Sequence, residues 1–309
     1  MAIRYRFSGH ETFPFRYLWP QKGVRGIIDD PNLFFREDAI VRLGVGKNMV
    51  SSIRFWCQAL GLAQADGRRR TAEPTELGRK LFGKHGWDPY LEDPGTLWLL
   101  HWELIDSPGI ASTWSLAFTG WRRDAFTRRE LVEWLALIAK ERANQHTSRN
   151  SLRRDVEVFI RTYVPTGARS RRAIEDTFDC PLSELGLLRR EDRDLYRFSR
   201  GAKPNLPIEI LAYALARYWD REAGGQETLT FDRVLYGLGS IGSAFQLSDA
   251  GLAAHLEALP NWAGFDYDET GGLRLLIRRE RARSRPPIRL LERYYASQAD
   301  KGKTTEVAA

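Results

Sequence analysis

The chain has 309 residues, enough for two or three domains that each bury a core of their own. It carries 47 Lys and Arg against 40 Asp and Glu, and a net charge of +7 suits a polyanionic partner because cations that neutralise phosphates release counterions. Apolar residues make up 43% of the chain, which argues against intrinsic disorder. The two cysteines, Cys57 and Cys180, exclude a disulfide scaffold and a cysteine-based zinc cluster.

The sequence predicts a cytoplasmic protein without membrane contact. No segment reaches the roughly 18 uninterrupted apolar residues that a bilayer span needs. The first residues carry charges where a signal peptide would place its apolar stretch.

The first distinctive segment is Phe7–Arg16, which mixes small, charged and aromatic residues and favours neither helix nor strand. The imidazole of His10 beside the carboxylate of Glu11 can serve as a base or metal ligand, and Arg16 can clamp a phosphate with two hydrogen bonds. The alternative is a polar arm that docks on its own domain.

Two short helices follow, over Arg36–Leu43 and Lys47–Leu60, separated by the turn Gly44–Gly46. The second helix has one apolar stripe, and its start and opposite face are polar and basic. The residues that we expect to read base edges or flanking phosphates there are Lys47, Asn48, Ser51 and Arg54.

A tight hairpin is predicted over Leu62–Glu73, with Asp66-Gly67 as a type I′ turn. Two helices, a glycine turn and an arginine-tipped hairpin are typical of a winged helix-turn-helix, whose second helix enters a major groove. Arg68, Arg69 and Arg70 would then contact phosphates or a minor groove. The alternative is ordinary core packing beside a solubilising turn.

A second helix pair is predicted to begin at Thr127 and Ser148, with a wing-like hairpin around Glu191–Asp194. Its arginines indicate either a second nucleic-acid surface or a solvated face with pairs such as Glu157 with Arg161. The C-terminal part is predicted to contain helices and a hairpin around Gly271-Gly272.

The expected fold is therefore mainly α with short β-hairpins and multiple winged helix-turn-helix-like units. The predicted boundaries are 1–90 for the arm and first winged-helix domain, 91–200 for a second winged-helix-like unit and 201–296 for a C-terminal unit. The polar composition of 297–309 predicts a disordered tail.

Four segments resemble a bacterial family that is found with DNA phosphorothioation genes: Phe7–Arg16, Phe34–Ala39, Leu43–Val50 and Gly239–Leu252. The nicking component of the Ssp-type DNA modification system looks like a member of this family. The resemblance implies a protein that nicks one DNA strand so that partners can install sulfur in the backbone. The implied partners are a cysteine desulfurase, an ATPase and an ATP-pyrophosphatase-like protein.

Strand nicking requires a nucleophile, positive groups near the phosphorus and usually a divalent ion that carboxylates hold. The expected ion is Mg²⁺ or Mn²⁺. The candidate catalytic residues are His10, Glu11, Arg16, Glu37 and Asp38. Glu37 and Asp38 could instead cap the helix that follows them. Two other functions remain open: a non-catalytic adaptor or transcriptional regulator on double-stranded DNA, and a protein-interaction scaffold. A homodimer is also compatible with the sequence.

Overall fold

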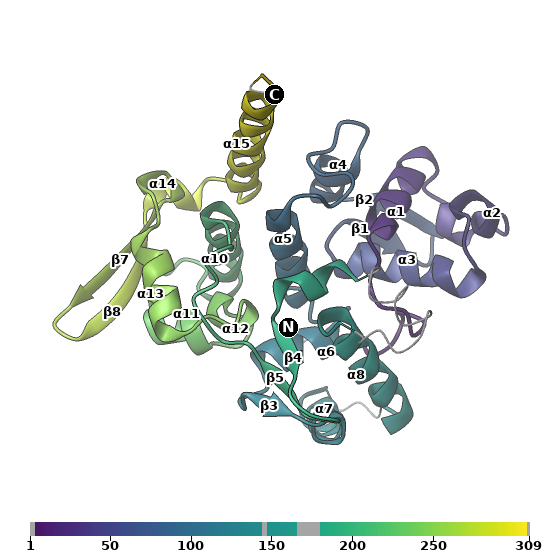
Figure 1. Cartoon of the computed structure of the whole chain (residues 1–309), viewed down its shortest axis with the longest axis horizontal. Coiled ribbons are helices and arrows are strands. Elements are labelled where there is room, and N and C mark those ends of the chain that lie inside the picture. The colour runs from purple at the N-terminus through teal and green to yellow at the C-terminus, as the bar shows by residue number, and fades with distance from the viewer. Residues whose placement is uncertain (1–3, 144–146, 166–179, 308–309) are drawn as a thin grey trace. The chain divides into compact units, whose positions relative to one another are not determined.

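The structure is a computed structural model that describes residues 4–143, 147–165 and 180–307 (Figure 1). It forms two compact units, Met1–Ser199 and Arg200–Ala309. The described residues contain no helix that is both long and apolar enough to cross a membrane. The boundary predicted at residue 90 falls inside the first unit, because the N-terminal arm packs against helices on both sides of that position.

The first part of unit 1 is a helical cluster with one hairpin. Its elements are α1 (Leu18–Asp29), η1 (Leu33–Phe35), α2 (Ala39–Leu43), α3 (Lys47–Ala59), β1 (Ala63–Asp66), β2 (Thr71–Pro74) and α4 (Glu76–Phe82). The predicted helix pair is confirmed as α2 and α3. Gly44 ends α2 with a φ of 64°, a conformation that a residue without Cβ adopts at little cost. The apolar stripe of α3 is buried, with Val50, Ile53 and Cys57 facing the core.

The β1–β2 hairpin has a longer loop than the sequence predicted. Asp66 pairs with Thr71, so the loop holds four residues, and the residue with positive φ is Arg70 at 55°. The prediction of a type I′ turn at Asp66-Gly67 was therefore wrong. The physical reason is that the Asp66 carboxylate accepts hydrogen bonds from the backbone amides of Arg68 and Arg69, at 2.9 and 3.1 Å. These bonds stabilise a longer loop than a two-residue turn.

The second part of unit 1 packs helices on a small sheet. Its elements are α5 (Pro94–Ile105), α6 (Ser112–Thr119), β3 (Ala125–Phe126), α7 (Arg128–Ala143), α8 (Arg149–Tyr163), η2 (Pro181–Leu185), β4 (Leu188–Arg190) and β5 (Tyr196–Phe198). The antiparallel strands lie in the order β3-β5-β4. Both predicted caps are confirmed: Thr127 and Glu130 exchange bonds at the start of α7, and Ser148 accepts the Ser151 amide at the start of α8.

Unit 2, like the second part of unit 1, has one strand that is followed by helices and then a hairpin. It contains α10 (Ile208–Glu222), β6 (Thr228–Thr230), α11 (Phe231–Tyr236), α12 (Ile241–Ala244), α13 (Asp249–Glu257), η3 (Asn261–Ala263), β7 (Phe265–Thr270), β8 (Leu273–Arg278), α14 (Glu280–Arg283) and α15 (Ile288–Val307). Its sheet has the order β6-β8-β7. The hairpin predicted at Gly271-Gly272 is confirmed, and both glycines have positive φ, 62° and 81°, as a two-residue turn requires.

Helix α15 continues through most of the segment that the composition predicted to be disordered. Its first turns bury Leu290, Leu291, Tyr294 and Tyr295, which fix the start of the helix. The residues that follow are good helix formers such as Gln298, Ala299 and Lys301, so the helix propagates beyond its packed part. The chain as a whole is mainly α-helical with short antiparallel hairpins, as predicted.

Candidate functional site

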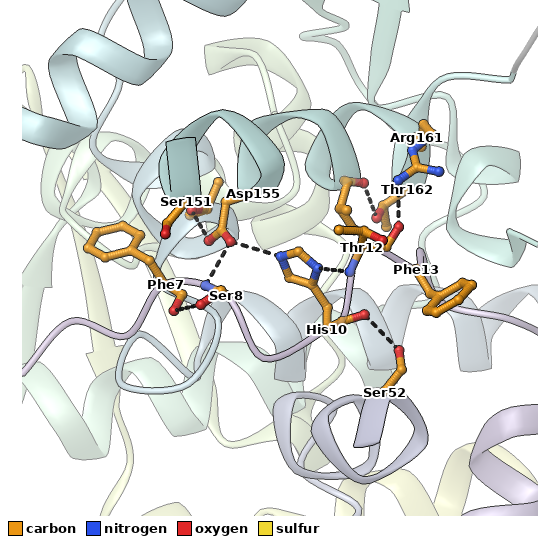
Figure 2. Close-up of polar contacts among 12 residues, drawn as sticks. Phe7, Ser8, His10, Thr12, Phe13, Ser52, Ser151, Asp155, Arg161 and Thr162 are labelled. Atoms are coloured by element: carbon orange, nitrogen blue, oxygen red, sulfur yellow. Dashed lines mark hydrogen bonds and ion pairs between the residues drawn. The ribbon is translucent and has the colours of Figure 1, made fainter. Parts of the chain in front are cut away.

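The N-terminal arm adopts an irregular path that brings one histidine into the core of unit 1. Ser8, Gly9, Glu11 and Thr12 all have positive φ, at 64°, 112°, 49° and 65°. Such conformations are uncommon for residues other than glycine and persist where the surroundings fix them. The arm is held between α3 on one side and α8 on the other, as Figure 2 shows.

His10 is the centre of this contact and is only 1% exposed. Its Nε2 lies 2.8 Å from Asp155 Oδ1, and its Nδ1 lies 3.1 Å from the amide nitrogen of Thr12 (Figure 2). Because a backbone amide can only donate, Nδ1 accepts and Nε2 carries the proton that it donates to Asp155. The ring lies edge-on to Phe55 and Trp114, each with a centroid separation of 5.7 Å.

The buried carboxylate of Asp155 on α8 accepts three hydrogen bonds. Its Oδ1 accepts from His10 and from the Ser8 amide at 2.7 Å, and its Oδ2 accepts from the Thr113 hydroxyl at 2.8 Å. The Ser52 hydroxyl of α3 donates to the His10 carbonyl at 2.9 Å. A buried charge is tolerated where several hydrogen bonds satisfy it, so this network docks the arm on its own unit.

The three candidate catalytic residues of the docked arm lie in different surroundings. Both ring nitrogens of His10 are engaged inside the unit, whereas Glu11 is exposed. The guanidinium of Arg16 lies over the rings of Phe13 and Trp19, 5.8 and 5.3 Å from their centroids. His10 and Glu11 therefore do not share one open site.

The other two candidate catalytic residues, Glu37 and Asp38, are exposed at the start of α2. Asp38 occupies the N-cap position of α2, and its side chain accepts no capping hydrogen bond there. It pairs instead with Arg36, at 2.7 Å from Nε to Oδ1, and this hydrogen bond lowers the pKa of the Asp38 carboxyl. The Asp38 carboxylate is thus engaged by Arg36, two residues before it in the chain.

The candidate carboxylates do not form a metal site by themselves. Within residues 4–143, 147–165 and 180–307, no three His, Cys, Asp or Glu side chains lie close enough together to hold a metal ion. Glu11, Glu37 and Asp38 thus do not build the carboxylate cluster that Mg²⁺ or Mn²⁺ was expected to use.

The predicted recognition residues lie on the outer side of α3. Lys47 and Asn48 are exposed, and Ser51 and Arg54 are half-buried. The Arg54 guanidinium lies over the Phe35 ring, 5.0 Å from its centroid. Burial and the charge of Arg6 lower the pKa of Arg54, whereas the charge of Glu11 raises it. Arg54 is thus held on α3 by its contact with Phe35, with the charges of Arg6 and Glu11 acting on it from the N-terminal arm.

The three hairpin arginines have different roles in the fold. Arg68 and Arg69 are exposed, and the side chain of Arg69 is 84% accessible. Arg70 donates to the Phe35 carbonyl at 2.7 Å, and its own carbonyl accepts from Asn32 at 2.8 Å. Arg70 therefore ties the hairpin to η1, while Arg68 and Arg69 project from it.

Sequence reasoning missed Asp155, the residue that fixes His10. The two are 145 positions apart, so spacing gave no direct link. A weaker signal exists within α8, because Leu152, Asp155, Val156 and Phe159 all follow one helical stripe. An acidic side chain on an otherwise apolar stripe indicates a buried polar partner.

The comparisons with known proteins cover nearly the whole chain. A magnesium ion-bound SspB crystal structure is 31% identical, with a TM-score of 0.81 over 99% of this chain and 98% of that one. A second SspB crystal structure is 30% identical, with a TM-score of 0.80 over the same shares. No curated protein matches. The model of a family described as a protein of unknown function, DUF4007, matches residues 7–295, and the chain therefore belongs to this family.

Proposed function

We propose that this chain is a DNA-binding protein of an Ssp-type phosphorothioation system and that it nicks one DNA strand. Its similarity to SspB, including a magnesium ion-bound form, supports a place in that system and a Mg²⁺-dependent reaction. The cysteine desulfurase, the ATPase and the ATP-pyrophosphatase-like protein that the family resemblance implies are its proposed partners, in the cytoplasm.

One observation carries the DNA-binding part of the proposal: α3 presents an exposed polar and basic start beside an arginine hairpin. This is the arrangement in which a winged helix places its second helix in a major groove and its hairpin on the backbone. The order of the described elements supports the same interpretation elsewhere. The runs β3-α7-α8-η2-β4-β5 and β6-α11-α12-α13-η3-β7-β8 each combine one strand, helices and a hairpin in a three-stranded sheet. We therefore propose three winged-helix units.

Nicking would take place where the arm meets α3. Glu11 is exposed on the arm, and its charge acts on the half-buried Arg54 of α3 at the proposed DNA surface. The carboxylate could orient an attacking water, and Arg54 or Arg16 could stabilise charge that develops on the phosphate. His10 would act by positioning the arm, since its nitrogens are engaged inside the unit.

A supercoiled-plasmid assay tests the nicking proposal. We expect the purified chain to convert supercoiled plasmid to the open circle with Mg²⁺ or Mn²⁺, and EDTA to stop the reaction. Binding to the plasmid without relaxation under any of these conditions would contradict nicking.

The second candidate function is a DNA-bound adaptor or regulator without catalysis. It is favoured by the docked state of His10, which lacks a free nitrogen in this network, and by the scattered carboxylates among the described residues. The plasmid assay separates the two functions, because an adaptor binds and leaves the strands intact.

Asn48 provides the test of base readout. Asn48→Ala should cost roughly 1–3 kcal/mol of binding free energy on a preferred duplex and less on others, because an amide at the start of a recognition helix can pair with one base edge. Gln58→Ala, near the end of the same helix, is the matched control. Affinities for a panel of duplexes provide the measurement. An equal loss on every sequence would reassign Asn48 to backbone contact.

A further inference from the structure

A pocket of about 410 Å³ lies in unit 1, and its lining includes no residue of α3 or of the β1–β2 hairpin. It is lined by the start of α7, the last turns of α8 and strand β4. Three arginines line it, Arg128, Arg161 and Arg190, together with one acidic residue, Glu157. The lining is therefore positive, and its arginines come from three different elements.

The arginines are held in place by the fold. Tyr196, which is 1% exposed, lies under two of them: its ring centroid is 5.1 Å from Arg128 Cζ and 5.9 Å from Arg190 Cζ. Arg128 also pairs with Asp194. Arg161 donates to the Thr12 carbonyl at 2.6 Å, which fixes it beside the docked arm. Arginines restrained in this way lose little freedom when a ligand binds.

Strand pairing explains why Arg190 faces the pocket. Arg190 pairs directly with Tyr196 across β4 and β5, and such cross-strand partners share one face of a sheet. Arg189 pairs with Arg197 and therefore lies on the other face, where it contacts Glu191 at 3.3 Å. The hairpin thus offers two adjacent arginines, only one of which lines the pocket.

A planar guanidinium donates two parallel hydrogen bonds to a phosphate, and several converging guanidiniums favour such an anion over a neutral ligand. The basic surface continues along α8, because Arg154 lies seven residues before Arg161 on the same face of the helix and is exposed. We propose that this pocket binds a backbone phosphate of a nucleic-acid strand that lies along α8 and the β4–β5 hairpin. This second contact rests on the proposed DNA binding of the chain.

Arg190→Ala tests the pocket, and Arg189→Ala is the matched control with the same change of charge. The affinity of the full chain for one labelled duplex is measured over a series of salt concentrations. For Arg190→Ala we expect the negative slope of log K against log salt to become shallower by about 0.9, the value of one lost phosphate contact. Arg189→Ala should keep the parental slope. Equal slopes in both variants would overturn the pocket assignment while leaving DNA binding intact.

A second measurement keeps the two proposals separate. Thermal unfolding with inorganic phosphate reports on the pocket without DNA, and we expect a rise in Tm in the parent and in Arg189→Ala that Arg190→Ala lacks. If the parent binds no duplex, the proposed function fails and the strand assignment fails with it. A rise in Tm confined to the parent and Arg189→Ala would then identify a pocket for a small phosphate compound instead of a strand.

Discussion

Replacing His10 with alanine should destabilise unit 1 by about 3 kcal/mol or more. The substitution removes the Nε2 donor from a buried carboxylate that the fold keeps away from water, and breaking such a pair typically costs about 3–5 kcal/mol. It also removes a ring that packs between Phe55 and Trp114. For a unit of this size the loss corresponds to a fall in Tm of roughly 6–12 °C.

Thermal unfolding of His10→Ala beside His85→Ala provides the measurement and its control, because His85 is exposed. Asp155→Asn should cost less than His10→Ala. Its amide oxygen can still accept from His10 Nε2 and the Ser8 amide, and its NH2 group can donate to the Thr113 hydroxyl, so mainly the negative charge is lost. A Tm for His10→Ala equal to that of His85→Ala would contradict the docking role.

Glu11→Gln separates docking from catalysis in the same arm. Since Glu11 is exposed, its conversion should leave the Tm near the parental value. If Glu11 takes part in nicking, the rate should fall by about a hundredfold to ten-thousandfold while DNA binding changes little. A parental nicking rate in this variant would direct the search to Glu37 and Asp38.

Much of the fold was predictable because local chemistry determines it. Thr127 and Ser148 start helices since their hydroxyl groups accept amides of the first turn, and Gly271-Gly272 forms a turn since both positions need positive φ. The β1–β2 loop differed because the Asp66 carboxylate competes with the backbone for hydrogen bonds. The long α15 differed because its packed first turns support a polar continuation that composition alone presents as disordered.

The candidate site was less predictable, because distant residues complete it. The sequence indicated that Phe7–Arg16 was either an active site or a docking arm, and only the fold brings Asp155 to His10 and Thr113 to Asp155. The sequence also grouped Arg68, Arg69 and Arg70 together. The structure distinguishes Arg70, which bonds to Phe35 within the fold.

Loss of Arg68 and Arg69 should have the second large effect, on affinity for duplex DNA. Both side chains are exposed on the loop that we propose as a wing. Each lost phosphate contact reduces the magnitude of the negative slope of log K against log salt by about 0.9, so the slope of the double variant should be shallower by about 1.8. If the affinities are equal at about 1 M salt, this variant binds roughly 60-fold more weakly near 0.1 M salt.

The salt dependence of duplex binding by the Arg68→Ala/Arg69→Ala variant tests the central claim, that α3 and the β1–β2 hairpin bind DNA. Arg283→Ala/Arg289→Ala in unit 2 removes the same charge from exposed positions and serves as the control. We predict a slope shallower by about 1.8 for the hairpin variant and a parental slope for the control. Identical slopes in the parent, the control and a folded hairpin variant would contradict the claim.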